Sequence, residues 1–218
     1  MYRFLIFWVF TSIYFYSKAQ FITTYYPNGK IKSEGCVSVV NKDTLKQGPW
    51  KLYFTTGKIN AEGSYFNGKM HGEWKYYHTS NGALEKTEQW RFGKQEGEQR
   101  EFFPTGKLAK SITYKNGVYE GAFTSFFPSG KIKNKGMYQA GFPAGVWDSF
   151  HEDGYLMESA TYENGILNGL YKSYYPTGIV QAEGYYSKGE KTGEWLYYDE
   201  KGEILKEPSK KKRRRNKK

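Results

Sequence analysis

The hydrophobic pattern of the chain restarts about every 24 residues, and each copy begins at a glycine. The opening glycines are Gly48, Gly72, Gly97, Gly121, Gly145, Gly169 and Gly193. With each opening glycine as position 0, position 2 is aromatic in six of the seven copies and position 5 is aromatic in all seven. Position 11 is aliphatic in six copies, and position 17 is usually tyrosine. Such self-similarity indicates tandem units that bury their apolar sides by stacking on one another.

Two turn signals divide each copy into two strand-like runs. One is a polar turn after position 6, as in 103–106, and the other is an Asn-Gly pair such as Asn67-Gly68. An Asn-Gly pair between strand-like runs is a strong signal for a two-residue hairpin turn. The turn lengths predict that position 6 faces position 11, position 2 faces position 15 and position 17 faces position 22. The sequence therefore predicts an all-β fold: an antiparallel meander of tandem β-hairpin repeats of about 24 residues, in an elongated, twisted sheet of about fourteen or fifteen strands.

The predicted register separates two faces of the sheet. The residues at positions 2, 11 and 17 share one face, because side chains alternate with a period of two. On this face we expect each position 2 ring to lie over a small residue at position 15 of its own hairpin, namely Gly63, Gly136, Ala160 or Gly184. The opposite face is mostly polar. Two cross-strand ion pairs are expected there, Lys51–Glu62 and Lys172–Glu183.

The position 5 aromatics point to the polar face and form the candidate contact surface. They are Tyr53, Tyr77, Phe102, Phe126, Phe150, Tyr174 and Tyr198. The adjacent cations of the candidate surface are Lys51, Lys75, Arg100 and Lys172. With one ring on every second strand, we expect the rings to stand roughly 10 Å apart. The expected partner of this surface is a protein that the sequence does not identify.

Residues 1–19 have the pattern of a secretory signal peptide. Arg3 precedes an apolar run over 4–16, and Ala19 and Gln20 flank the expected cleavage site. The run is shorter than the about 20 residues needed to cross a bilayer, so we expect no transmembrane span in the mature chain. These features predict an exported protein of the bacterial periplasm, cell envelope or extracellular space. The alternative is a buried N-terminal strand.

The rest of the chain divides into three parts. Residues 20–47 are an irregular first half-repeat, with an insertion at 36–47 that suggests added strand length. Residues 48–207 hold seven tandem repeats, and the one extra residue of the second predicts a bulge or a longer loop near Ser80-Asn81. Residues 208–218 are an expected disordered polybasic tail. The single cysteine, Cys36, excludes an intramolecular disulfide.

The net charge of +11 is concentrated in the tail. The rest of the chain is nearly neutral. The eight cationic residues of the tail are Lys210, Lys211, Lys212, Arg213, Arg214, Arg215, Lys217 and Lys218. In an exported chain, such a tail is expected to bind an anionic envelope surface, with an affinity that falls as salt rises. Export argues against nucleic acid as the partner. The alternative is a solvated tail without a partner.

The residues that could carry catalysis or bind a metal have simpler explanations. His78 and His151 occupy position 6, which is aromatic in most copies, and no Cys or His pair has the spacing of zinc ligands. Ser149, His151 and Asp153 would share one strand face at two-residue spacing, which does not allow a catalytic relay. The glycines lie in turns rather than in a phosphate-binding loop. The sequence therefore predicts a non-enzymatic protein without a cofactor or a metal.

The pattern Gly-x-Trp-x-x-Tyr-Tyr-x-x-Gly-x-Ile, followed by Tyr-x-x-Gly-x-x-x-Gly, resembles the variant MORN repeat. It is best preserved at residues 48–68 and 193–198, and the similarity covers about residues 25 to 207. The resemblance implies a β-hairpin array that serves as a protein-interaction or envelope scaffold. The chain also resembles the YwqK-type antitoxin family, which implies the alternative function of binding and neutralising a cognate toxin.

Overall fold

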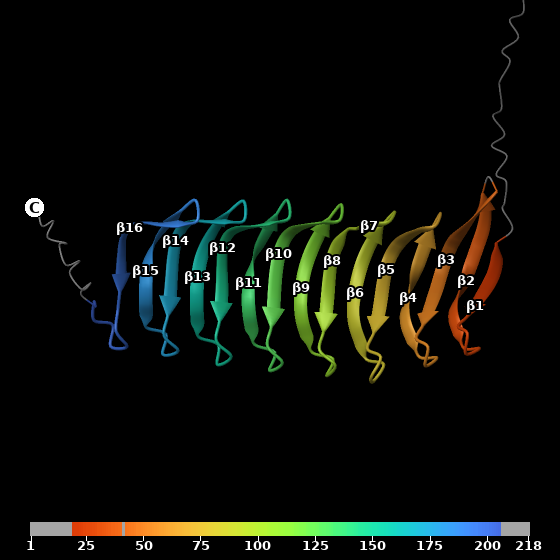
Figure 1. Ribbon diagram of the computed structural model, residues 1–218, viewed down its shortest axis with the longest axis horizontal. Coiled ribbons are helices and arrows are strands. Elements are labelled where there is room, and N and C mark those ends of the chain that lie inside the picture. Colours follow the sequence, from red (N-terminus) through yellow and green to blue (C-terminus); the bar gives the residue numbers. More distant parts are fainter. Residues whose placement is uncertain (1–18, 41, 206–218) are drawn as a thin grey trace, which may run out of the picture.

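A computed structural model describes residues 19–40 and 42–205, which form one antiparallel sheet of 16 strands (Figure 1). No helix occurs among these residues. The strands are β1 (Gln20–Tyr25), β2 (Ile31–Val40), β3 (Asp43–Tyr53), β4 (Ile59–Phe66), β5 (Lys69–Tyr77), β6 (Leu84–Arg91), β7 (Lys94–Gln95), β8 (Gly97–Phe102), β9 (Leu108–Lys115), β10 (Val118–Phe126), β11 (Ile132–Gln139), β12 (Phe142–Phe150), β13 (Leu156–Glu163), β14 (Ile166–Tyr174), β15 (Val180–Ser187) and β16 (Glu190–Tyr197).

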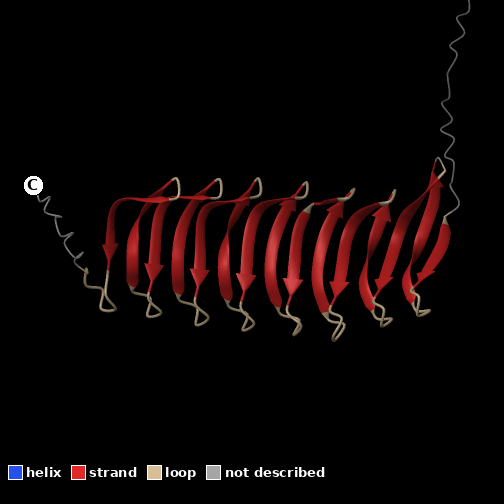
Figure 2. Cartoon of the chain, in the orientation of Figure 1, coloured by secondary structure: helices blue, strands red, loops and turns tan. Residues whose placement is uncertain are grey.

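The strands follow one another in chain order from β1 to β16, so the sheet is an open meander with β1 and β16 at its ends. The short β7 pairs only with β6 and lies outside this continuous order of strands. The continuous order therefore contains fifteen strands, within the predicted number of fourteen or fifteen. Figure 2 shows a single elongated row of strands with turns along both edges. The predicted fold class is thus confirmed.

Two-residue turns join the hairpins along the upper edge in Figure 1. Asn67 and Gly68 both have positive φ, 48° and 76°, as a type I′ turn requires. The expected pairing of position 17 with position 22 is confirmed by Tyr65 with Met70 and Tyr114 with Tyr119. Each turn glycine also binds the preceding hairpin, since the Gly68 amide donates to the Lys46 carbonyl at 2.9 Å. Neighbouring repeats are therefore joined at this edge as well as through the sheet.

The opening glycines have a structural role that the sequence pattern alone did not explain. All seven have positive φ, from 66° to 121°, a conformation that favours glycine. Each interrupts the ladder with the preceding strand: beside Gly72 the register shifts between the pairs Glu62–Lys75 and Ser64–His71. Such a bulge bends and twists the strand that carries it. The 24-residue period thus marks a repeated bend in every second strand.

The position 2 rings lie over the glycine of the preceding repeat, which corrects the expected packing. Trp50 is the Cα partner of Gly63 in its own hairpin, as expected. Its indole, however, leans toward the previous strand, where a β-carbon built at Gly35 would be 2.4 Å from the indole Cδ2. The same relationship joins Gly63 to Trp74, Gly136 to Trp147 and Gly184 to Trp195. Where position 2 is not tryptophan, the preceding residue is not glycine: Glu88 precedes Gln99, Ile112 precedes Phe123 and Ala160 precedes Tyr171.

The lean toward the previous strand also satisfies a backbone carbonyl beside each bulge. The indole N–H of Trp74 donates to the carbonyl of Ser64 at 3.0 Å, and that of Trp50 donates to the carbonyl of Cys36 at 2.9 Å. The ring of Tyr65 stands edge-on between the two indoles, with centroid distances of 5.9 and 5.0 Å. Trp50 and Trp74 are thereby almost fully buried, at 2% and 1% exposure, within a single layer. Tryptophan and tyrosine share one face, as predicted.

The turns along the lower edge differ from expectation by one residue. Position 5, not position 6, pairs with position 11, as in Tyr53 with Ile59, and a bulge restores the register at Leu52 with Ala61. The position 6 residue instead closes the turn, since the Phe54 amide donates to the Lys58 carbonyl. The longer loop expected in the second copy is confirmed, because there the His78 amide reaches the Ala83 carbonyl.

The two ends of the array are irregular. β2 and β3 continue their pairing through the insertion as far as Val40 with Asp43, which confirms the added strand length. The seventh repeat contributes only β16 as a full strand, and its second half is reduced to one bridge between Tyr198 and Ile204. The expected signal peptide up to residue 18 and the expected tail lie outside the described residues.

Candidate interaction surface

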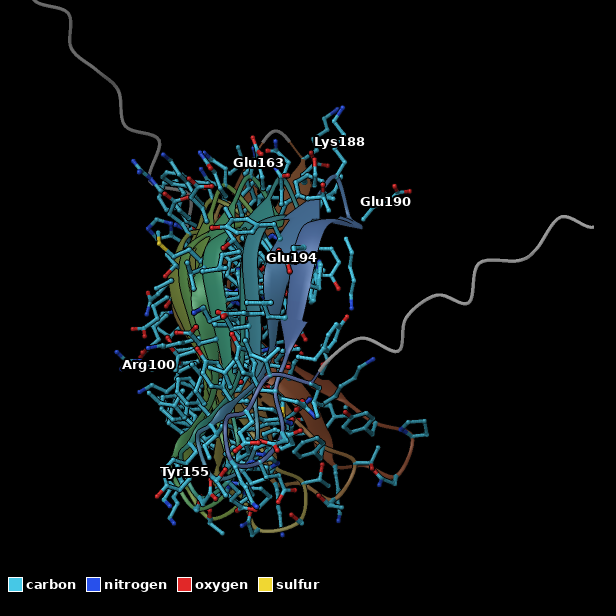
Figure 3. All side chains as sticks on the ribbon, turned by 90° about the vertical axis from the view of Figure 1, so that its left-hand side faces the viewer. Arg100, Tyr155, Glu163, Lys188, Glu190 and Glu194 are labelled. Carbon is cyan, nitrogen blue, oxygen red and sulfur yellow. The ribbon has the colours of Figure 1, made fainter. Side chains whose placement is uncertain are left out.

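The face opposite the tryptophans is called the polar face here, and it carries positions 1, 3, 5, 14 and 16. Lys51 at position 3 is the Cα partner of Glu34 on one side and of Glu62 on the other, both at position 14. Figure 3, which looks along the array, shows Arg100 at position 3 projecting away from one side of the sheet. The described chain has no second layer over this face.

The row of position 5 aromatics lies on the polar face, as the sequence predicts. All seven side chains are half-buried. Three of the four tyrosines in the row donate their hydroxyl to a position 14 glutamate of the preceding repeat: Tyr53 to Glu34 at 2.5 Å, Tyr77 to Glu62 at 2.6 Å and Tyr198 to Glu183 at 2.7 Å. These three rings are therefore held in place by a hydrogen bond between repeats. Phenylalanine fills the central copies, at Phe102, Phe126 and Phe150.

These hydroxyls are held in the neutral form. Burial, and then the hydrogen bond to Glu34, raise the pKa of Tyr53 to about 12. Burial and the bond to Glu62 raise the pKa of Tyr77 to about 12 as well. At Tyr198 the hydrogen bond to Glu183 is the main cause of a raised pKa. A neutral phenol beside a carboxylate donates a charge-assisted hydrogen bond, which is shorter and stronger than an ordinary one.

The predicted cations differ in their pairing. Lys172 binds Glu183 at 2.7 Å, which confirms one of the two predicted ion pairs and raises the pKa of Lys172. Arg100 pairs with Glu98 at 2.6 Å and Lys75 with Glu73 at 3.4 Å, both within one strand. The predicted Lys51–Glu62 pair is wrong. These residues are Cα partners, but no ion pair within 4.0 Å joins them in the described chain, and Glu62 accepts the Tyr77 hydroxyl instead.

Sequence reasoning missed a difference between the two halves of the polar face. In the first three repeats, positions 1 and 16 pair Pro49 with Ser64, Glu73 with Gln89 and Glu98 with Thr113. In the next three they pair Ala122 with Met137, Val146 with Thr161 and Leu170 with Tyr185. The exposed fractions are 58% for Met137, 56% for Val146 and 57% for Tyr185. A comparison of positions 1 and 16 between repeats would have revealed this change.

The described residues offer no group of three or more His, Cys, Asp or Glu side chains that could hold a metal ion. His78 lies beside the Phe102 carbonyl at 3.3 Å and 3.8 Å from Glu85, in the slot at position 6. Asp153 of the discounted triad caps its own turn, since its carboxylate accepts the amide of Tyr155. Along 19–40 and 42–205, no helix is long and apolar enough to cross a membrane.

The remaining predicted site residues lie at the ends of the chain. Ala19 is exposed, and Gln20 is the first residue of β1, where it pairs with Val37. Cleavage between them would leave the whole sheet intact. The cationic tail residues, from Lys210 to Lys218, fall outside the described part.

Comparison with protein families finds the MORN repeat variant in five segments, at residues 22–37, 46–67, 95–116, 119–140 and 167–188. No curated protein matches the chain. The two unmatched hairpins, β5–β6 and β12–β13, keep the same opening glycine with positive φ and the same pairing pattern. The chain is therefore built from MORN variant repeats.

Proposed function

We propose that the protein is a non-enzymatic interaction scaffold whose contact surface is the polar face. The observation that carries this proposal is the row of position 5 aromatics. Three of its seven rings are fixed by hydrogen bonds between repeats, and the row lies on a sheet face that no second layer covers in the described chain. Rigid aromatic side chains lose little conformational entropy on binding and are enriched at protein interfaces.

The cations beside the row would steer an acidic partner toward the N-terminal half of this face. Lys51 is exposed, and Lys75 and Arg100 remain substantially open to solvent, at 43% and 53% of their side-chain surface. Charges of this kind increase association rates and define register more than they increase affinity. A protein with an acidic contact surface is therefore the proposed partner.

Capture of envelope proteins on the immobilised chain tests this surface. The K75E/R100E variant should lose the captured partner while keeping the wild-type melting temperature, because about half of each side chain already lies in solvent. The matched control is K188E, which changes an exposed lysine at a turn on the other half of the sheet. Equal capture by wild type and K75E/R100E would contradict the proposed surface.

We also propose that the chain is exported and that its tail attaches it to an anionic envelope surface. Cell fractionation should find the protein outside the cytoplasm and lacking residues 1–19. Deletion of residues 209–218 should release it from envelope membranes at low salt, since each cation near an anionic surface contributes up to about 1 kcal/mol. A cytoplasmic, uncleaved chain in a stoichiometric complex with a toxic protein would instead support the antitoxin alternative.

A further inference from the structure

Exposed apolar side chains gather on the polar face between β10 and β15. An outer row beside the two-residue turns consists of Val118, Phe142 and Ile166, which are 45%, 57% and 51% exposed. An inner row consists of Met137, Val146, Leu170 and Tyr185, which are 39% to 58% exposed. These two rows are called the apolar patch. The first three repeats lack this apolar surface. Their position 1 residue is proline or glutamate, and lysine replaces the outer-row residue at Lys69 and Lys94, where two of their strands begin.

The patch belongs to one face because of the strand register. Met137 is the Cα partner of Ala122 on one side and of Ala144 on the other. Val146 pairs with Thr161, and Leu170 pairs with Tyr185. The outer row packs against the turns. A β-carbon added at the turn glycine Gly165, for example, would lie 3.1 Å from the Cδ1 of Phe142. The apolar side chains therefore gather on one face across neighbouring strands. Thr161 interrupts the inner row on β13, and Gln139 and Glu163 alternate with the outer row.

We propose that the apolar patch is the interface between two copies of this chain. Antiparallel sheets with an apolar face commonly pack on a second sheet at about 10 Å. At roughly 100 Å² of exposed surface for each half-exposed side chain, the patch presents about 700 Å² per copy, close to the about 800 Å² per partner of a standard interface. Exposed apolar surface gathered on one face to this extent marks an interaction site.

The arrangement of the two rows selects the symmetry. The outer row follows one edge of the sheet. It can pack against the outer row of the second copy only if the two-fold axis runs parallel to the strands, because this axis keeps the same edge on the same side in both copies. This axis reverses the direction of the second array and places β10 over β15 and β9 over β16. Glu190 on β16 and Lys115 on β9, both exposed and both beside the two-residue turns, then face each other across the interface. Two-fold symmetry forms this pair twice.

The charges around the patch favour a second copy over a membrane. Figure 3 shows Glu163 and Glu190 at the edge that carries the turns, and Glu194 farther along β16, the strand that begins at Glu190. Glu120 adds a fourth carboxylate at the opposite end of the patch and accepts the amide of Ala140. Carboxylates at the rim repel the anionic lipids of an envelope surface, whereas the reversed copy offers Lys115 to Glu190.

The dimer would leave β1 to β8 of each copy uncovered. This part of the polar face carries Lys51, Lys75 and Arg100, the cations of the proposed contact surface. Self-association therefore uses the apolar patch, whereas the cations that steer an acidic partner lie outside it. Failure of either proposal leaves the other standing.

Sedimentation equilibrium of the purified chain under reducing conditions, so that Cys36 cannot link copies, tests the dimer. The V146E/L170E variant introduces glutamate at position 1 of two repeats. Three other repeats already have glutamate there, as Glu73, Glu98 and Glu194, so the variant should fold. We expect a dimer for wild type and a monomer for V146E/L170E, with the dissociation constant raised by about thirtyfold or more for each buried site. The matched control, Glu73→Gln, should remain dimeric.

Three further variants keep the test decisive. If V146E/L170E loses its β-sheet circular dichroism, M137T/Y185T replaces it, because Thr113 and Thr161 already occupy position 16. E190K should weaken the dimer, and E190K/K115E should restore it. A wild-type monomer at all concentrations, or a dimer that V146E/L170E and M137T/Y185T leave unchanged, would overturn the proposal. So would a monomer that binds phosphatidylcholine vesicles through the patch.

Discussion

The indole of Trp74 lies directly over Gly63 on the preceding strand, and a β-carbon at Gly63 would stand 2.3 Å from the indole Cδ2. Gly63→Ala should therefore displace the indole and its hydrogen bond to Ser64. Overpacking of this kind costs typically about 1–3 kcal/mol. Urea denaturation followed by tryptophan fluorescence measures the loss of stability.

The chain itself supplies a rescue for this substitution. Ala160 precedes Tyr171 in the same arrangement, so Gly63→Ala combined with Trp74→Tyr should recover most of the lost stability. Ala160→Gly is the matched control, because it creates no clash, and it should change stability far less than Gly63→Ala does. Equal melting of Gly63→Ala and wild type would show that the indole can move without cost.

Glu88 interrupts the stripe of rings on the tryptophan face. It is 4% exposed, binds Lys86 at 2.8 Å and accepts the indole N–H of Trp90 at 2.9 Å. Glu88→Ala should cost about 1–3 kcal/mol, because it leaves the partly buried donors of Lys86, Trp90 and Gln95 without their acceptor. Thermal unfolding measures this loss. Glu88→Gly with Gln99→Trp rebuilds the glycine–tryptophan relationship of the other repeats and should melt above Glu88→Ala.

The two-residue turns differ in how well their first residue suits a positive φ. Ala140 has φ of 50°, whereas Asn116 occupies the equivalent place with φ of 54°. Asparagine tolerates this conformation better than alanine, so Ala140→Asn should stabilise the protein by about 1 kcal/mol. Asn116→Ala should destabilise it by a similar amount. The backbone amide donates to a glutamate in both turns, which makes the pair a matched comparison in chemical denaturation.

Alkaline pH should loosen the position 5 row. The folded protein raises the pKa of Tyr53 and Tyr77 from 10.0 to about 12, so their contribution to stability is complete below pH 10. It is lost as pH rises from 10 to about 12, where the unfolded chain ionises first. The urea midpoint of wild type should therefore fall more steeply over this range than that of Y53F/Y77F. Parallel profiles would contradict this assignment.

The regular parts of the fold follow directly from the repeat pattern. The Asn-Gly turns determine which residues pair on either side, and Tyr65 meets Met70 as predicted. The lower turn could not be placed to the residue, because a bulge near Tyr53 takes up one position. The direction in which the indoles lean depends on the bulge at each opening glycine, which spacing alone does not reveal. A comparison of each tryptophan with the preceding repeat would have identified the correct glycine partner.

The candidate surface was predictable in its location but not in its bonds. The row from Tyr53 to Tyr198 lies on the predicted face. Glu62, however, accepts a hydrogen bond from Tyr77 rather than pairing with Lys51, and this depends on side-chain geometry between repeats. The apolar patch was missed because positions 1 and 16 were treated as equivalent in all copies. A repeat pattern describes what copies share, whereas Val146 and Met137 differ from their counterparts.

The glycine–tryptophan relationship also governs where the array can be shortened. Removal of residues 50–73 would bring Trp74 next to Gly35, so the new junction keeps a bare backbone beneath an indole. Removal of residues 99–122 would place Phe123 against Glu88, an apolar ring on a buried carboxylate. Loss or gain of whole units should thus be tolerated only at matching junctions, and each such event would change the length of the protein by roughly 10 Å.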